Sequence, residues 1–508
     1  MNWKSTGNFA RRWARAVGAH PKWLGATVSI LAAAALFVPP VIYQLQNFHL
    51  GWHDVGNYTR ANYNFFEFGR FAVFSDGTGD FFVDQHFEPF FFLLCLPTRL
   101  WGTSGYVSAV TAAIILAAGY VFVLARAVSR SSWVAALCAA AYVANPYTYA
   151  IALSYRVEAF GILFLLALAY HSYVGQLGRA WLALALALTV KEDMWVYALV
   201  VALLVARRDR LRQTAAFAAA ALCYYVVVVQ LIGGSWYPSA HYFNSFYESE
   251  GHVPTKLQIA LQLLGRWREF LPLLFTGPGL RFQASLLLVG ILSGWRYGLA
   301  CAVMLFWLMY PGGPPRSNLA IYYSYAPLLM SFVILPFALV NLRAASARVA
   351  HRVDAGRCGG WAVGLVMTVV VATDVVMHLP GHVPGPIAPV IERESVYGKG
   401  PGVNVRVVRR LIDTYLTADT GSVLAQFYTV PSVPQHRQVY LTLFDRGRFL
   451  DGRLKPKYVL LDLGAADPYV LPEQLRDMAA MLRRGDEYAP LYDLGGVLLY
   501  QRRAVEGR

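Results

Sequence analysis

The chain has 508 residues, of which 57% are hydrophobic and 14% are charged, and its formal net charge is +15. An average soluble chain is roughly 45–50% apolar and about 25% charged, so this composition excludes an ordinary soluble protein and indicates an integral membrane protein. Many of the basic residues form short clusters beside apolar runs, as topology signals do, and no nucleic-acid-binding motif accompanies them. We therefore expect no nucleic-acid partner.

Residues 1–22 form a basic tail, and the apolar run at 23–43 is too long for the core of a secretory signal. We interpret this run as a retained first membrane helix. Together with ten later segments it predicts about eleven spans, and a shorter run at 87–97 reads as a re-entrant or interfacial helix. The later segments are at 105–125, 133–149, 159–174, 180–190, 194–206, 214–232, 281–294, 297–310, 322–342 and 361–378.

A cytoplasmic N-terminus places every basic cluster on one side of the membrane, as the positive-inside rule requires. The same topology places the polar loop 44–104 and four further polar segments together on the outer face. We predict a multi-pass protein of the cell (inner) membrane. The four further segments are 155–158, 191–193, 235–269 and 312–325.

Residues 380–389 read as a proline-rich linker, after which the pattern becomes that of a soluble domain at 390–508. Its length of roughly 110–120 residues suits one domain. We expect helices at 405–418 and 472–484, and strands at 422–427, 458–462 and 496–501. The predicted fold class is an all-α polytopic membrane domain at 23–379 followed by a small exported α/β domain.

The loop at 51–89 is acidic, and a polar loop between membrane spans has to be held by protein because lipid cannot satisfy its backbone. Asp54 lies in this loop shortly after the first span. Its carboxylate suits a general base for a hydroxyl group or a cation ligand. The structural alternative is an N-cap for a helix that starts near Asn57.

His86 lies between Asp84 and Glu88 in the same loop. Their alternation places all three side chains on one side of an extended segment, where they would suit a divalent metal or a metal-bound phosphate. The alternative is a solvated start of the following helix.

Arg156 and Glu158 stand at the beginning of another predicted span. Charged groups at a membrane edge are costly enough to indicate function. The planar guanidinium of Arg156 suits the phosphate of a lipid-linked substrate. A structural pair between the two residues is the alternative.

Lys191, Glu192 and Asp193 interrupt an apolar run at 180–206. We predict two short helices that meet at the outer leaflet and turn these charges into an aqueous cavity. Lys191 would neutralise a phosphate, while Glu192 or Asp193 would fix the phosphate or a metal. A plain outer loop is the alternative.

Aromatic residues gather on the predicted outer face, where they suit either sugar stacking or an interfacial belt. They are Tyr58, Tyr63, Phe65, Phe66, Trp236, Tyr237, Tyr242, Tyr322, Tyr323 and Tyr325.

The chain contains, in order, Asp-Val-Gly after the first span, His-Phe-Glu-Pro, Arg-Val-Glu, Val-Lys-Glu-Asp and Tyr-Tyr-Ser-Tyr-Ala-Pro. Over most of its length it resembles a bacterial and archaeal family of integral membrane proteins of unknown function. That family resembles the GT-C glycosyltransferases, which take sugars from polyprenyl-phosphate carriers on the outer face. The resemblance implies a GT-C-like membrane domain and, by position, makes Asp54 the essential acid. It also implies cavity roles for His86, Glu158, Lys191, Glu192 and Asp193.

One position departs from the pattern of that family. Arg156 stands two residues before Glu158, where the family usually has a histidine. This departure argues against a metal-binding role at that position.

The favoured function is transfer of a sugar from a polyprenyl-phosphate carrier to an acceptor, with Asp54 as the catalytic residue. One alternative is a carrier or flippase for a lipid-linked substrate. Another is a membrane scaffold whose exported domain binds a protein partner. The expected ligands are a lipid-linked sugar and membrane lipid, and the residues leave open whether a divalent metal serves as cofactor.

Overall fold

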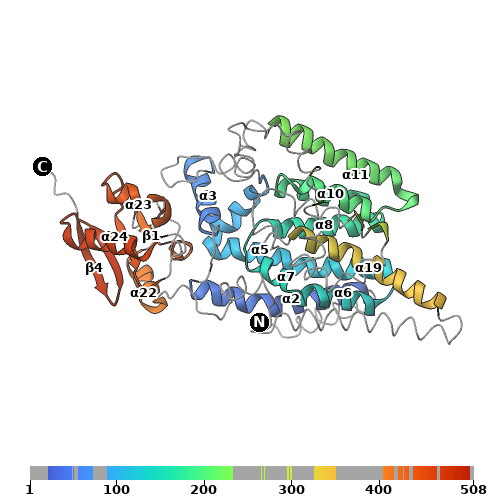
Figure 1. Ribbon diagram of the computed structural model, residues 1–508, viewed down its shortest axis with the longest axis horizontal. Helices are drawn as coiled ribbons and strands as arrows, with labels where there is room; N and C mark the ends of the chain where they lie inside the picture. Colours follow the sequence, from blue (N-terminus) through green and yellow to red (C-terminus); the bar gives the residue numbers. More distant parts are fainter. Residues whose placement is uncertain are drawn as a thin grey trace, which may run out of the picture. The chain divides into compact units, whose positions relative to one another are not determined.

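The structure is a computed structural model that is mostly helical and contains a five-stranded sheet near the C-terminus (Figure 1). The chain divides into two compact units, and each is considered by itself. The helical unit is Met1–Val38, Phe87–Pro89 and Val110–Val390, and the sheet unit is Pro39–His86, Phe90–Ala109 and Ile391–Arg508. The residues that the structure describes are 21–48, 50, 55–71, 88–232, 265, 268, 294–296, 298–299, 325–349, 404–416, 421–426, 428–433, 439–465 and 470–503.

Within the described residues, three helices are long and apolar enough to cross a membrane: Trp23–Gln46, Phe91–Ser129 and Arg208–Val228. Shorter apolar helices accompany them, so the prediction of a helical membrane domain is confirmed. The predicted spans at 281–294, 297–310 and 361–378 fall almost entirely outside the described residues, and the count of about eleven spans stays a prediction.

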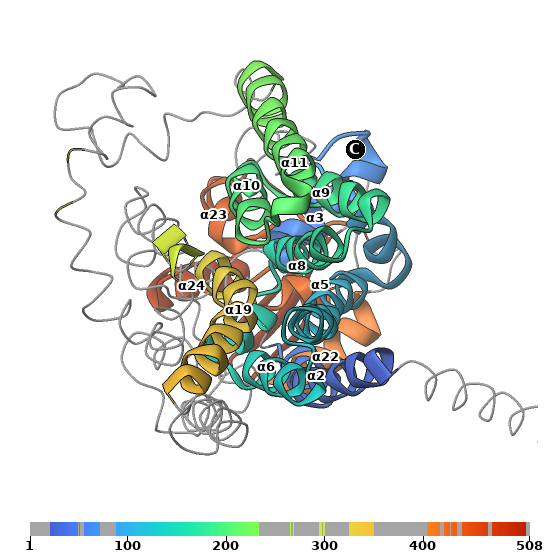
Figure 2. The same ribbon diagram turned by 90° about the vertical axis from the view of Figure 1, so that its right-hand side faces the viewer.

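Helix α8 (Glu158–Val174) is the central helix of the helical unit, because α9, α10 and α19 all pack against it. Its buried side chains lie on every side, as expected for an apolar helix enclosed by others. Figure 2 shows α8 close to end-on, with α9, α10 and α19 around it. The other elements of the unit are α2 (Pro21–Gln46, in part), α5 (Phe91–Ser129, in part), α6 (Ser132–Ala144), α7 (Pro146–Ala152), α9 (Leu177–Val190), α10 (Met194–Leu204), η1 (Arg208–Arg210), α11 (Leu211–Tyr224), η2 (Tyr225–Ile232) and α19 (Tyr325–Val349).

The predicted single span at 133–149 is wrong, because α6 ends at Ala144 and α7 begins at Pro146. Proline has no backbone N–H with which to continue α6. The Asn145 side chain instead accepts a hydrogen bond of 2.9 Å from the Tyr147 backbone N–H and caps α7. An Asn-Pro pair inside an apolar run thus marks a helix break here.

The predicted short run at 87–97 and the span at 105–125 both fall largely within α5. Two residues with non-helical backbone, Trp101 and Gly102, separate them. Gly102 has a φ of 59°, in the left-handed region that glycine adopts readily. The separation of the two apolar segments is therefore confirmed, with the break at a glycine.

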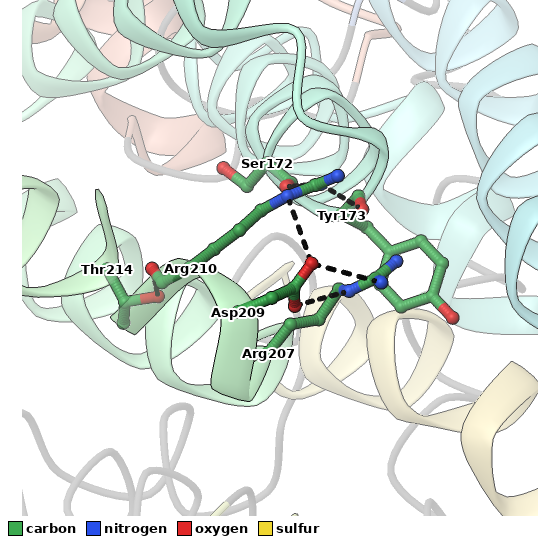
Figure 3. Close-up of polar contacts among 6 residues, drawn as sticks. All are labelled: Ser172, Tyr173, Arg207, Asp209, Arg210 and Thr214. Carbon is green, nitrogen blue, oxygen red and sulfur yellow. Dashed lines mark hydrogen bonds and ion pairs between the residues drawn. The ribbon is translucent and has the colours of Figure 1, made fainter. Parts of the chain in front are cut away.

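The C-terminal end of α8 is held by arginine (Figure 3). The Arg210 guanidinium donates to the carbonyl oxygens of Ser172 at 3.1 Å and Tyr173 at 2.6 Å. The Ser172 carbonyl also accepts from the backbone N–H of Gly175 at 3.3 Å. A cation at these last carbonyls suits the negative end of the helix dipole. Arg207 lies 5.4 Å from the centre of the Tyr173 ring and donates to Asp209 at 3.1 Å. We call these five residues the arginine end of α8.

The sheet unit contains a five-stranded sheet in the order β2-β1-β3-β5-β4. β1 is parallel to β2 and β3, whereas β5 is antiparallel to both β3 and β4. Successive residues of a strand face opposite sides, and here α22 covers one face while α23 and α24 cover the other (Figure 1). The small C-terminal α/β domain is thus confirmed. Its elements are α22 (Val405–Tyr415), β1 (Val423–Ala425), η8 (Val430–Ser432), β2 (Val439–Leu441), α23 (Thr442–Leu450), β3 (Tyr458–Asp462), α24 (Pro472–Arg484), β4 (Tyr488–Leu494) and β5 (Val497–Arg502).

The end of the first apolar helix belongs to the same unit as this domain. Arg409 of α22 donates to the carbonyl oxygens of Leu45 at 3.1 Å and Gln46 at 2.8 Å, in the last turn of α2. Phe48 is buried in the core beneath α22, and α3 (Val55–Phe68) packs against η8. The α/β domain is therefore built onto the end of the first helix and the segment that follows it.

Candidate functional site

The site is built around Lys191, between α9 and α10. α9 ends at Val190, Lys191 has an extended backbone with φ −161° and ψ 156°, and α10 begins at Met194. The apolar run is thus split into two short helices at the charged triplet, as predicted. The break brings three consecutive ionisable side chains to one end of these helices.

Lys191 forms a buried ion pair with Glu158. Its Nζ lies 2.7 Å from Glu158 Oε1, and the two side chains are 7% and 0% exposed. Glu158 is the first residue of α8, where the helix dipole favours a carboxylate. Removing one partner of a buried pair typically costs about 3–5 kcal/mol, because the other charge stays buried and unpaired. The pair therefore fixes both residues in place.

Glu88 is a third buried member of the site and lies just before α5. Burial raises the pKa of its carboxyl well above the usual value, and the negative charge of Glu158 raises this pKa further. Lys191 acts in the opposite direction. Glu88 accordingly holds a proton at pH values where an ordinary glutamate is ionised.

Several carboxylates share the positive charge of Lys191. Burial alone lowers the pKa of Lys191, but the charges of Glu158, Asp193, Glu192 and Glu88 outweigh it and raise that pKa well above the usual value. The neighbouring carboxylates therefore favour the charged form of Lys191.

Asp193 is held by the first residue of α19. The Tyr325 hydroxyl donates to Asp193 Oδ2 at 2.5 Å, and the Tyr325 ring stacks edge-on against Tyr197 of α10. Burial raises the pKa of Asp193 to about 6, while Lys191 and the Tyr325 hydrogen bond work against this rise. A segment more than a hundred residues distant in the chain thus completes the site.

Arg156 is supplied by the strained connection between α7 and α8. It is buried, and its positive charge favours ionisation of Glu88 and Glu158. The preceding Tyr155 has a φ of 52°, a left-handed conformation that typically costs about 1–3 kcal/mol in a residue with a bulky side chain. Backbone strain of this kind is concentrated at functional sites. The left-handed Tyr155 therefore indicates that the connection between α7 and α8 is functional.

We call the six ionisable side chains at this site the charged cluster. Four carboxylates face two cations, so the cluster favours protons or a further cation. Glu158 Oε2 and Asp193 Oδ1 accept no hydrogen bond from the described residues and are acceptors available to a ligand. Its members are Glu88, Arg156, Glu158, Lys191, Glu192 and Asp193.

Five of the seven residues predicted for the site belong to this cluster: Arg156, Glu158, Lys191, Glu192 and Asp193. Asp54 and His86 lie outside the described residues, so their roles stay predictions. From the sequence, Glu88 was considered only together with Asp84 and His86 as a metal ligand, and Tyr325 only among the aromatic residues. The available sequence signal for Glu88 was an acidic residue directly before an apolar helix.

The fold and the cluster define a helical membrane protein with an ionisable site between its helices and a small α/β domain. The chain belongs to the family of predicted membrane proteins designated DUF2079, whose model matches residues 53–498. This membership confirms the predicted relation to an integral-membrane family, and the likeness to GT-C enzymes stays a prediction. A comparison with the curated proteins finds no match.

Proposed function

We propose that the chain transfers a sugar from a polyprenyl-phosphate carrier to an acceptor on the outer face of the membrane. The observation that carries this proposal is the buried Lys191–Glu158 pair with Glu88 beside it, among the apolar helices of a membrane protein. Ionisable groups are expensive in such surroundings and mark substrate sites or ion pathways.

The two ends of α8 support an outer-face site. The charged cluster lies at its N-terminus and the arginine end at its C-terminus, about 25 Å away for a helix of this length. The positive-inside rule assigns the arginine end to the cytoplasm. The cluster then lies toward the outer side, where a lipid-linked donor and its acceptor would meet.

In the proposed reaction, the acceptor oxygen attacks the anomeric carbon of the sugar while its proton passes to the Asp54 carboxylate. The bond from that carbon to the carrier phosphate breaks, and its electron pair leaves with the phosphate. Arg156 stabilises the departing phosphate through its planar guanidinium. Lys191 joins it only if phosphate replaces Glu158 as its partner, since the two are already paired.

The remaining cluster residues and His86 would hold the substrate. Glu88 in its protonated form donates a hydrogen bond and adds no negative charge that would repel the phosphate. Among the described residues, no three His, Cys, Asp or Glu side chains are grouped to hold a metal ion.

The proposal is tested by comparing lipid-linked sugars in a deletion strain complemented with the wild-type chain or with Asp54→Asn. We expect Asp54→Asn to accumulate the donor as the deletion does, although the protein is inserted normally. Asp80→Asn, the same change elsewhere in the acidic loop, is the matched control and should restore transfer. Full complementation by Asp54→Asn would refute the assigned role.

The acid excess of the cluster also favours a second candidate, a proton-coupled carrier for a lipid-linked substrate. Buried acids that exchange protons are typical of carriers in membranes. A carrier site must be reached from both faces, whereas an outer-face transferase site need not be. Cysteine labelling at position 192 from each side of sealed vesicles distinguishes them, since labelling from both sides indicates the carrier.

A further inference from the structure

A groove of about 600 Å³ lies in the helical unit between α2, α5, α8 and α9. Each helix lines it with residues spaced three or four positions apart, which is the spacing of one helix face. On α9 these residues are Arg179, Leu182, Ala183 and Leu186. The volume falls within the roughly 300–1,000 Å³ that is usual for ligand sites.

Small side chains create this hollow and large ones form its rim. Ala167 and Ala183 line it and are buried, whereas Leu182, Leu116 and Trp23 line it and are 61%, 44% and 45% exposed. These exposed rim residues lie on apolar helices of a membrane protein, so lipid is their expected surrounding. The groove is therefore open toward lipid, and an acyl chain can fill it without the cost of burying a polar group.

One part of the groove is polar. His171 is buried, with Nδ1 2.8 Å from Gln176 Oε1 and Nε2 3.4 Å from the Tyr120 hydroxyl. Arg179 donates to the same Gln176 oxygen at 3.3 Å. Arg179 is exposed and forms no ion pair with any carboxylate in the described part of the chain. The apolar groove thus adjoins the Arg179 guanidinium, whose other N–H groups can donate to a ligand.

The position of this polar part indicates the kind of lipid. His171 and Arg179 flank the connection from α8 to α9, next to the arginine end. The positive-inside rule assigns that end to the cytoplasm, and the cytoplasmic leaflet carries anionic lipids. A guanidinium matches the geometry of a phosphate.

We infer that this groove binds one anionic phospholipid of the cytoplasmic leaflet. Its phosphate contacts Arg179, and one acyl chain lies along Leu182 and Leu186. The seven positions from Arg179 to Leu186 cover about 10 Å of helix, which is two-thirds of the roughly 15 Å depth of one leaflet. This site is separate from the charged cluster and does not depend on the proposed transferase activity.

Native mass spectrometry of the purified full-length chain, titrated with phosphatidylglycerol or with phosphatidylcholine, tests this inference. We expect one tightly bound phosphatidylglycerol and about a fivefold preference for it, of the size that one arginine near a membrane surface provides. Arg179→Gln should abolish the preference, and its exposed position makes a folding defect unexpected. Arg130→Gln removes the same charge at the end of α5, outside the groove, and should keep the preference.

Two further measurements separate the lipid from other ligands. Ala183→Phe fills the hollow and should weaken binding of both lipids, whereas soluble glycerol phosphate should not displace phosphatidylglycerol. The inference is overturned if the wild type binds the two lipids equally, or if Arg130→Gln lowers the preference as much as Arg179→Gln. Displacement by glycerol phosphate would also overturn it, because the site would then be one for soluble phosphate.

Discussion

The two ends of α8 carry charges in opposite ways. At its N-terminus, Glu158 pairs with Lys191 in complete burial, whereas at its C-terminus Arg207 and Asp209 form a pair that is 42% and 55% exposed. An exposed pair contributes little to stability, and a buried one is often no better than well-packed apolar residues. The arginine end thus serves topology and helix capping, and the charged cluster, which stability alone does not require, indicates a function.

The largest effect is expected for the substitution Lys191→Met. It leaves Glu158 buried without its cation, so we expect the free energy of unfolding to fall by about 3–5 kcal/mol. Denaturant titration of the detergent-solubilised chain measures the change. The double variant Lys191→Met with Glu158→Gln removes both charges and should recover most of the loss. If it does not, burial of an unpaired charge is the wrong explanation.

The next effect concerns Glu88 and pH. Its pKa is raised in the folded protein, so the folded state holds more protons than the unfolded state. Stability from this group is therefore present at low pH and is lost as the pH rises from its unfolded pKa through its raised folded pKa. Glu88→Gln keeps the neutral form, so we expect a smaller loss of stability between pH 5 and 8. An unchanged pH dependence would contradict the assignment.

Tyr325→Phe removes the hydrogen bond to Asp193, and a bond to a charged group is typically worth about 1.5–3 kcal/mol. The hydroxyl lowers the pKa of Asp193, so its loss should raise this pKa above the present value of about 6. Infrared titration of the carboxyl band, with Asp193→Asn to assign it, measures the shift. A lower pKa in Tyr325→Phe would be the opposite of what we expect.

The smallest effect is expected at the arginine end. Arg210→Met leaves no buried charge behind. It removes a cap on the last carbonyls of α8, worth about 0.3–1 kcal/mol, and a partly exposed ion pair with Asp209 that contributes little. The same denaturant titration compares it with Lys191→Met, which also removes one cation. A loss as large as that of Lys191→Met would erase the contrast between the two ends.

Local patterns predicted much of the fold. The strand Tyr458–Asp462 and the helix Pro472–Arg484 have the bounds that the sequence indicated. β2 (Val439–Leu441) was not predicted, because three residues are too few for a recognisable alternation. It is a strand by virtue of its parallel pairing with β1. The break at Asn145 was missed because apolar composition outweighed a proline signal.

The site was predictable to the extent that charge interrupts apolar sequence. Lys191 was identified on that ground, and so was the pair of short helices around it. The segments that carry its partners were expected to meet on one face. The individual contacts with Glu88 and Tyr325 could not be predicted, because tertiary packing decides which of the many acids and tyrosines meet.

The central claim is that the charged cluster serves a reaction and not the fold alone. The most direct test complements a deletion strain with the double variant Lys191→Met with Glu158→Gln and measures its lipid-linked sugars. We expect the variant to be folded and inserted, and to accumulate the unused donor as the deletion does. Normal turnover of the donor by a folded double variant would show that the buried pair is dispensable and would contradict the proposal.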